Sequence, residues 1–325
     1  MKITRVHAVP VRVPRKKAMS SALGVIRASE FGVVFVDTDE GIQGLGEISM
    51  NLGRAGISLS HDVNTLIAPE LVGKNPLNIQ SLVRLMDQIL DGSEPAKCAV
   101  EMALFDIAGK VCNVPVYQLL GGKIRDRIPV TWSIGFGEPE AVAEEAMAYA
   151  EQGFKHIKLK VGRPDSDLDA ETVRAVRRRA GDGIRIRIDA NAGYRNALEA
   201  VREILKLEEF GLEMAEQPVP GKQLDAMAFI RKRIHTPLAA DESMYRWPDA
   251  VELVKKEAAD ILNIYISECG GLLAAQKAFA IGEAAGMPVL IGSQCEMGIA
   301  TAAQLHLAAA MPNLAYSCDF GGPLR

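Results

Sequence analysis

The sequence predicts an α/β protein in which a parallel (β/α) barrel follows a small α+β domain. The main observation is a series of polar residues that end short apolar runs: Lys160, Asp189, Glu216 and Asp241. The intervals between them are 29, 27 and 25 residues, and each interval fits one strand, one helix and two loops of a barrel. The second observation is that this alternation begins only after about residue 125.

Composition excludes several classes of function. The 325 residues are 48% hydrophobic and 24% charged, which is typical of a soluble globular protein with one large and one smaller domain. The net charge of −4 and the absence of a basic tract argue against nucleic acid and anionic membrane as partners. No apolar run approaches the roughly 20 residues that span a bilayer.

Cysteine and histidine usage gives further limits. Five cysteines without CxxC spacing, in a sequence that shows no signal peptide, favour reduced thiols and a cytoplasmic location. The five histidines form no HxH or HExxH pair. This pattern argues against a zinc hydrolase.

Residues 1–125 predict the α+β domain. Alternating apolar residues predict strands at 2–13, 33–37 and 44–48. Helical periodicity predicts helices at about 62–70, 78–90 and 96–112. Residues 18–27, which contain serine and glycine, are expected to form a loop between the first two strands. Such a loop could serve as a lid or as an ordinary connection.

Residues 126–325 predict the barrel. The expected strands are about 128–134, 156–160, 184–189, 213–216, 238–241, 261–266, 288–292 and 314–318. Helices are expected between them, for example at 139–151, 168–180, 195–209 and 272–285. Eight such steps without an antiparallel hairpin place functional residues at the carboxyl ends of the strands.

Three carboxylates predict a metal site. Asp189, Glu216 and Asp241 end three consecutive strands, so they are expected to meet at the barrel mouth. Hard oxygen ligands from a contiguous arc suit Mg²⁺. A single acid could equally cap the next helix, but three unpaired acids at one mouth would repel each other. Asn191 and Glu242 are adjacent to these residues and could support the ligands or cap helices.

Two lysines on one strand predict a base. Lys158 and Lys160 are two residues apart, so both side chains are expected to point toward the mouth. A buried ammonium beside a second ammonium is expected to have a lowered pKa, which would make one lysine a usable general base. The alternative is a strand end with two solvated lysines.

Further candidates come from the later strands and from the first loop. On the sixth strand Tyr265 is expected to face the mouth, either as an acid/base or as an aromatic that fills the barrel, with Asn263 on the same side. The remaining candidates for substrate contact are Ser293, Gln294, Glu296, Asp319 and Arg27.

The motifs KLK, DAN, EQP, ADES and NIY…CGG, in this order and spacing, resemble the enolase superfamily. Within it they are most similar to the muconate-lactonizing enzyme subgroup of the mandelate racemase/muconate lactonizing enzyme family. The segment at 97–122 also resembles the family's junction between its two domains. The resemblance implies a modified TIM-type barrel beneath an N-terminal α+β capping domain, with a specificity loop near residues 18–27. Because family chains continue past the eighth strand, the returning C-terminal segment is expected to be absent here.

The resemblance also assigns roles. It implies that Asp189, Glu216 and Asp241 bind an essential Mg²⁺ and that Lys160 is the catalytic base. Lys158 would tune that base or touch the substrate carboxylate. The implied chemistry is removal of the proton next to a carboxylate, with the metal stabilising the enediolate. The implied partner is a small carboxylate substrate, and the resemblance also allows a homo-oligomer.

Tyr265 departs from the family pattern, because most members of the subgroup carry a second lysine there. This difference favours one-base chemistry by Lys160, either β-elimination such as dehydration or cycloisomerisation. The alternative is a racemase or epimerase of an amino acid or related carboxylate, with Tyr265 as the second acid/base. A third hypothesis is a metal–carboxylate binding protein without catalysis.

Overall fold

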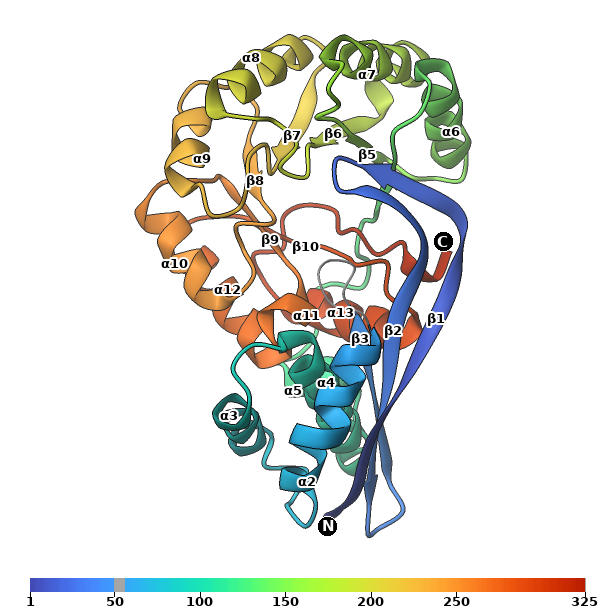
Figure 1. Ribbon diagram of the computed structural model, residues 1–325, viewed down its shortest axis with the longest axis vertical. Coiled ribbons are helices and arrows are strands. Elements are labelled where there is room, and N and C mark those ends of the chain that lie inside the picture. The colour runs from blue at the N-terminus through green and yellow to red at the C-terminus, as the bar shows by residue number, and fades with distance from the viewer. Residues whose placement is uncertain (50–55, 325) are drawn as a thin grey trace.

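The computed structural model describes residues 1–49 and 56–324. It contains a curled sheet of parallel strands surrounded by helices and, beside it, a three-stranded antiparallel sheet packed on helices (Figure 1). The expected fold class, a modified barrel with an N-terminal α+β cap, is confirmed. Among the described residues, no helix is long and apolar enough to cross a membrane.

The antiparallel sheet has the order β1-β2-β3, formed by β1 (Ile3–Ser21), β2 (Gly24–Thr38) and β3 (Gln43–Ser49). The expectation that residues 18–27 form a loop is wrong. Met19 pairs with Ile26 and Ser21 pairs with Gly24, so both strands continue almost to the hairpin tip. Gly24 has a φ of +115°, a conformation that glycine adopts without strain at a tight turn.

The long hairpin reaches across to the barrel (Figure 1). Near its tip the backbone N–H of Phe136 donates to the Ser20 carbonyl at 3.0 Å, and the Ser20 hydroxyl donates to the Phe136 carbonyl at 2.9 Å. A Cβ at Gly193 would lie 2.9 Å from the Ala22 Cβ. The hairpin tip is therefore fixed between the loop after β4 and the loop after β6.

The helices of this part pack closely on the sheet. They are α1 (Gly56–Asp62), α2 (Ala68–Leu71), α3 (Ile79–Ile89), α4 (Glu94–Cys112) and α5 (Val116–Leu119), with a π-helical turn at Val63–Ile67. That turn lies within the helix expected at 62–70. A Cβ at Gly46 would lie 1.8 Å from the Ala99 carbonyl oxygen, so α4 rests directly on β3.

Seven parallel strands form the barrel sheet in the order β10-β9-β8-β7-β6-β5-β4. They are β4 (Thr131–Ile134), β5 (His156–Lys160), β6 (Arg185–Asp189), β7 (Leu212–Glu216), β8 (Leu238–Ala240), β9 (Ile261–Ile264) and β10 (Val289–Ile291). The helices around them are α6 (Pro139–Glu151), α7 (Ser166–Ala180), α8 (Ala197–Glu208), α9 (Leu224–Arg231), α10 (Trp247–Lys255), α11 (Ile266–Cys269), α12 (Leu272–Ala284) and α13 (Gly298–Ala310).

The eighth strand, expected at 314–318, is not continuous. This segment pairs with β10 through Val289 and Leu314, and with the other edge of the sheet through Val130 and Cys318. Each neighbour forms only one isolated bridge with the segment, so neither side has a ladder of consecutive pairs. Backbone hydrogen bonds still run to both sides, including Thr131 N–H to the Cys318 carbonyl at 2.8 Å and Asp319 N–H to the Ile291 carbonyl at 3.1 Å. The segment thus closes the barrel.

Two hydrophobic clusters account for most of the core. One packs the antiparallel sheet against α1–α4, with Val34, Leu59 and Leu104 at its centre. The other lies between the barrel strands and their helices. The boundary predicted near residue 125 falls between α5 and β4 and stays a prediction.

Buried glutamates join the two parts. Glu47 on β3 accepts hydrogen bonds from the backbone N–H of Met297, at 2.7 Å, and of Ala300, at 3.0 Å, where α13 begins. Glu101 on α4 accepts from the backbone N–H groups of Leu272 and Leu273, where α12 begins. A carboxylate satisfies the free N–H groups at a helix N-terminus. Each glutamate thus anchors a barrel helix to the N-terminal part.

Replacing Glu101 with glutamine is expected to change how stability depends on pH. Burial raises the pKa of Glu101 from 4.5 to about 8, against the two backbone hydrogen bonds that lower it. Between about pH 5 and pH 8 the folded protein keeps a proton that the unfolded chain releases. The free energy of unfolding therefore falls as pH rises through this window, by up to about 1.4 kcal/mol per pH unit for this group.

Denaturant unfolding across this pH range tests the expectation. The Glu101→Gln protein should show a shallower decline than the wild type. Glu283→Gln, on the exposed surface of α12, provides the control and should parallel the wild type. Equal slopes for wild type and Glu101→Gln would contradict the assignment.

Candidate functional site

Three carboxylates meet where the central barrel strands end. Asp189 and Glu216 are the last residues of β6 and β7 and are paired in register, and Asp241 directly follows β8. All three are buried, and one oxygen of each lies within 4.8 Å of the others. The donor set is entirely oxygen, which suits a hard divalent cation held by carboxylates. The expected convergence of these three residues is therefore present in the structure.

Two ammonium groups adjoin this triad. The Lys160 Nζ lies 2.5 Å from Asp189 Oδ2 and donates to Asn191 Oδ1 at 2.6 Å. The Lys158 Nζ lies 2.6 Å from Asp319 Oδ2 and 3.1 Å from Glu216 Oε1. Lys158 is buried more deeply than Lys160, because it projects from the middle of β5 whereas Lys160 ends it. The two lysines are therefore not equivalent.

The expectation that the lysine pair lowers a pKa is wrong for Lys158. Burial alone would lower the pKa of this ammonium, but Asp319, Glu216 and Asp189 together raise it well above 10.5. Neighbouring carboxylates outweigh the repulsion between ammonium groups. Lys158 therefore remains positively charged at neutral pH.

The carboxylates respond to the same charges. Burial would raise the pKa of Asp189, but Lys160 and Lys158 outweigh this effect and hold it below its ordinary value. Burial raises the pKa of Glu216, with Lys158 opposing it. Burial and Glu242 raise the pKa of Asp241. A cation at the triad would favour the ionised forms of all three.

Tyr265 lies across the barrel from Lys160. Three strands, β6, β7 and β8, separate β5 from β9, and Tyr265 directly follows β9. Its hydroxyl lies 3.4 Å from Asp241 Oδ2, so it flanks the triad on the side opposite Lys160. A Cβ at Gly292 would lie 2.3 Å from the Tyr265 ring, so glycine is needed at that position. Burial, and next Asp241, raise the pKa of Tyr265 well above 10, which keeps the phenol protonated.

Asn191 and Asn263 support the charged groups. The Asn191 side chain accepts from Lys160 and donates to Glu242 Oε1 at 3.2 Å. The Asn263 amide donates to Glu216 Oε1 at 3.0 Å. The first asparagine thus links the lysine to Glu242, and the second orients a triad carboxylate.

The remaining predicted residues divide into two groups. Ser293, Gln294 and Asp319 line a cavity at the barrel mouth. Glu296 is buried outside that lining and holds its own loop together through Ser293 and the backbone N–H of Gln294. Arg27 is exposed and also lies outside the lining. Since side chains alternate along a strand, Ile26 faces the cavity instead.

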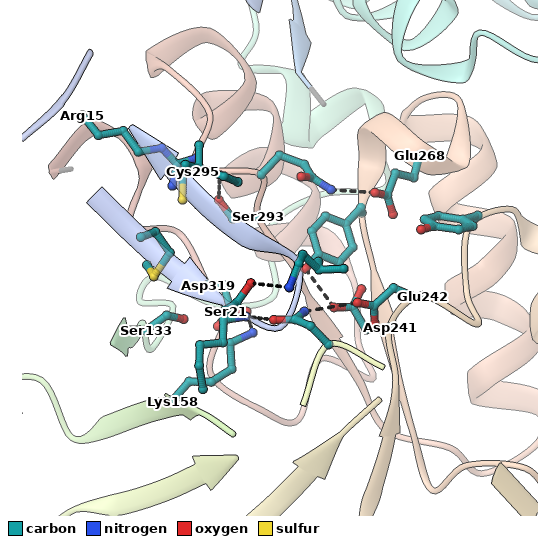
Figure 2. A pocket seen from close by; sticks show the side chains of 18 residues that line it. Arg15, Ser21, Ser133, Lys158, Asp241, Glu242, Glu268, Ser293, Cys295 and Asp319 are labelled. Carbon is teal, nitrogen blue, oxygen red and sulfur yellow. Dashed lines mark hydrogen bonds and ion pairs between the residues drawn. The ribbon is translucent and has the colours of Figure 1, made fainter. Parts of the chain in front are cut away.

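Sequence reasoning assigned no individual role to half of the residues that line the cavity. The hairpin contributes Arg15, Met19, Ser21, Leu23 and Ile26. The barrel adds Ser133, Tyr245, Glu268 and Cys295. Figure 2 shows Arg15 and Cys295 on one side of this cavity and Glu242, Asp241 and Glu268 on the other. The SECGG segment contains the carboxylate of Glu268. Four of the hairpin residues lie within the specificity loop that the family resemblance implied near residues 18–27, whereas Arg15 lies outside it.

Gln217 lies outside the cavity lining and was also missed. Its side-chain oxygen accepts from the backbone N–H of Asp241 at 2.9 Å and of Ser243 at 3.1 Å. Its amide donates to the Ser243 hydroxyl at 2.9 Å. Gln217 therefore fixes the loop that presents Asp241. The EQP motif contained it, but the sequence alone gave no contact to assign.

Two family models match the chain. The model of the mandelate racemase/muconate lactonizing enzyme N-terminal domain matches residues 3–121, and the model described as enolase C-terminal domain-like matches residues 141–325. Together they cover nearly the whole chain.

Relatives with assigned activities match along the full chain. The N-succinyl-L-Arg/Lys racemase of Bacillus cereus is 35% identical over 100% of this chain and 88% of its own length. The L-Ala-D/L-Glu epimerase of Bacillus subtilis is 34% identical over 100% of this chain and 89% of its own. The chloromuconate cycloisomerase CbnB of Cupriavidus necator is 30% identical over 99% of this chain and 88% of its own.

Solved structures of epimerases have the same fold along the full chain. The substrate-liganded L-Ala-D/L-Glu epimerase of Bacillus subtilis superposes with a TM-score of 0.95 at 34% identity, over 100% of this chain and 91% of the other. The dipeptide epimerase of Enterococcus faecalis in complex with Mg and the dipeptide L-Leu-L-Tyr gives a TM-score of 0.94 at 33% identity, over 99% and 91%.

Proposed function

The chain belongs to the mandelate racemase/muconate lactonizing enzyme family of the enolase superfamily, and from this membership we propose that it is a Mg²⁺-dependent racemase or epimerase of an amino-acid derivative. The inverted carbon would be the one next to the substrate carboxylate. The observation that carries the proposal is that Lys160 and Tyr265 flank the carboxylate triad from opposite sides of the barrel. Racemases and epimerases at 34–35% identity support this reaction over one-base chemistry. From Tyr265 alone, one-base chemistry was the preferred hypothesis and racemisation or epimerisation the alternative.

Asp189, Glu216 and Asp241 would hold the Mg²⁺. Their all-oxygen donor set and mutual distances fit this ion, and dipeptide epimerases have been crystallised with Mg. When bound, the ion would supply the positive charge that stabilises the enediolate formed from the substrate. Asn263 and Gln217 would keep two of the ligands in position through the hydrogen bonds described above.

Lys160 would remove the proton from one face of the substrate. Its position at the strand end, with Asn191 accepting a hydrogen bond from it, leaves the amine directed into the cavity that it lines. Lys158 would keep its charge and attract the substrate carboxylate, because Asp319 and Glu216 maintain it as an ammonium. The two lysines would thus have separate tasks.

Tyr265 would deliver a proton to the opposite face. Its phenol is protonated, as a donor must be, and its hydroxyl lies beside Asp241 at the far flank of the triad. In the reverse direction a phenolate would have to act as the base. In the forward direction Lys160 would gain the substrate's proton and Tyr265 would give its own to the substrate, so the pair would end as ammonium and phenolate. The reverse reaction starts from that state, and one proton returned from Lys160 to Tyr265 through solvent would restore the forward state.

A second candidate is the one-base reaction, β-elimination or cycloisomerisation by Lys160 alone. Tyr265 is the observation that favours it, because a phenol is a weak base at neutral pH. The cycloisomerase relative at 30% identity is compatible with this reaction. In both candidates Lys160 removes the proton.

Replacing Tyr265 with phenylalanine separates the two. If the protein is an epimerase, the variant should lose about 10²- to 10⁴-fold in stereochemical inversion, because the second face has no proton donor. Exchange of the α-proton in ²H₂O with retention should continue within about tenfold, since Lys160 is unchanged. Inversion is measured by chiral chromatography and exchange by NMR, on N-acylated amino acids and dipeptides with Mg²⁺ present.

Tyr194→Phe is the matched control, because Tyr194 is also buried but its hydroxyl has no hydrogen-bond partner and lies outside the cavity. It should leave both rates unchanged. The epimerase is rejected in favour of one-base chemistry if the wild type catalyses elimination or ring closure without inversion and Tyr265→Phe retains that turnover. Absence of α-proton exchange with every carboxylate would favour a binding protein.

A further inference from the structure

Glu268 carries a buried carboxyl group at the wall of the cavity. It lies on α11 and is 5% exposed. The Gln294 amide donates to its Oε1 at 2.6 Å, which fixes the orientation of the side chain. Its Oε2 has no hydrogen-bond partner, and no ion pair to Glu268 occurs within residues 1–49 and 56–324. An unpartnered oxygen therefore remains at the cavity wall.

Glu242 has a similar arrangement on the same side. Its Oε1 accepts from Asn191 at 3.2 Å, while its Oε2 is buried and has no hydrogen-bond partner among the described residues. Figure 2 shows Glu268 and Glu242 on one side of the cavity, with Arg15 on the other. Tyr245 and Tyr265 line the same cavity. One wall thus combines two unpartnered carboxylate oxygens with two aromatic rings.

The three cationic side chains that line the cavity contact residues other than Glu268. Lys160 contacts Asp189, Lys158 contacts Asp319 and Glu216, and Arg15 donates to Ser29. Burial, with Glu242 and Glu296 nearby, raises the pKa of Glu268 to about 8. Glu268 therefore holds a proton at neutral pH, because ionising a buried carboxyl group without a partner is costly. A bound cation would remove much of that cost and displace the proton. The wall is therefore arranged to receive positive charge.

We propose that Glu268, together with Glu242, binds a positively charged organic group of the substrate, an ammonium or a guanidinium, while the substrate carboxylate faces Lys158 and Lys160. This inference rests on the proposed function and names the substrate class: a carboxylate that carries a cation away from its reacting carbon. The faces of Tyr245 and Tyr265 would add cation–π attraction. The two rings favour an organic cation over Ca²⁺ or Mg²⁺, both of which take oxygen ligands.

Equilibrium binding tests the inference without turnover. Calorimetry with Mg²⁺ present compares two pairs that differ in charge: N-acetyl-L-arginine with N-acetyl-L-citrulline, and L-alanyl-L-alanine with N-acetyl-L-alanyl-L-alanine. The first pair places the cation on the side chain and the second places it at the amino end. In at least one of the two pairs, the charged ligand should bind about 10- to 100-fold more tightly than its neutral counterpart, as expected for a hydrogen bond between charged groups.

Glu268→Gln should reduce this preference to within about threefold, whereas Glu268→Asp, which keeps the charge, should retain part of it. Glu101→Gln is the matched control, because Glu101 is equally buried and has a pKa of about 8 but lies outside the cavity. It should leave the preference unchanged. Circular dichroism establishes that each variant is folded.

The outcomes separate this inference from the proposed function. The cation site is overturned if the charged and neutral ligands of both pairs bind equally, or if none of the four ligands binds. It is also overturned if the wild type binds a second Mg²⁺ that Glu268→Gln does not bind, because the occupant is then a metal ion. A charge preference that depends on Glu268, in a protein that shows no α-proton exchange, supports the cation site and rejects the proposed function. Exchange of the α-proton without a charge preference in binding supports the proposed function and overturns the cation site.

Discussion

Replacing Lys160 with alanine is expected to reduce α-proton exchange by at least about 10³-fold, because no other described group at the cavity can replace it as the base. Lys158 is the nearest amine, but its carboxylate neighbours keep it protonated. Tyr265 is on the far flank and is itself protonated. The measurement is the rate of deuterium incorporation from solvent into N-acylated amino acids or dipeptides with saturating Mg²⁺.

The effect should appear in turnover rather than in binding. Lys160→Ala removes a contact to Asp189, but the triad and Lys158 remain, so Mg²⁺-dependent substrate binding should stay within about tenfold. Lys155→Ala, on the approach to β5 at the other end of the strand, is the control and should leave exchange unchanged. Substantial exchange in Lys160→Ala would exclude Lys160 as the base in both candidate reactions.

The barrel was predictable because its signals are local. Apolar runs that end in a polar residue predicted β5 at 156–160 without error and the end of β6 at Asp189. The failures occurred where pairing with distant chain segments decides the structure. The hairpin at 18–27 extends because each strand is the partner of the other and the tip is held by Phe136. The eighth strand is irregular because each of its two neighbours pairs with it at a single bridge.

The site was predictable only in part, for a related reason. Strand ends place Lys160 and the triad together by topology, so the order of residues was enough to expect their convergence. The pKa of Lys158 depends on Asp319, which is 161 residues away, and no local pattern reports that contact. The same holds for Gln217, whose role is defined by the backbone of the loop that follows β8. Residues that act through long-range contacts require the structure.

Replacing Asp241 with asparagine is expected to weaken Mg²⁺ binding and to lower α-proton exchange by about 10²-fold or more. The wild type should be stabilised by Mg²⁺, by about 2.7 kcal/mol at a concentration 100 times the dissociation constant. Asp241→Asn should lose most of this stabilisation over the same Mg²⁺ range, because one of the three anionic ligands is neutral. Thermal unfolding against Mg²⁺ concentration measures this effect independently of any activity.

The pH dependence of the same titration tests the mechanism of binding. Burial raises the pKa of both Glu216 and Asp241 above their ordinary values, so protons compete with the metal for these oxygens. The stabilisation by Mg²⁺ should therefore decrease as pH falls, and calorimetry should detect proton release on binding. Asp260→Asn, at the opposite end of the barrel where Asp260 accepts from the Leu238 N–H, should retain the full Mg²⁺ effect. If Asp241→Asn and Asp260→Asn respond alike to Mg²⁺, the triad does not hold the ion.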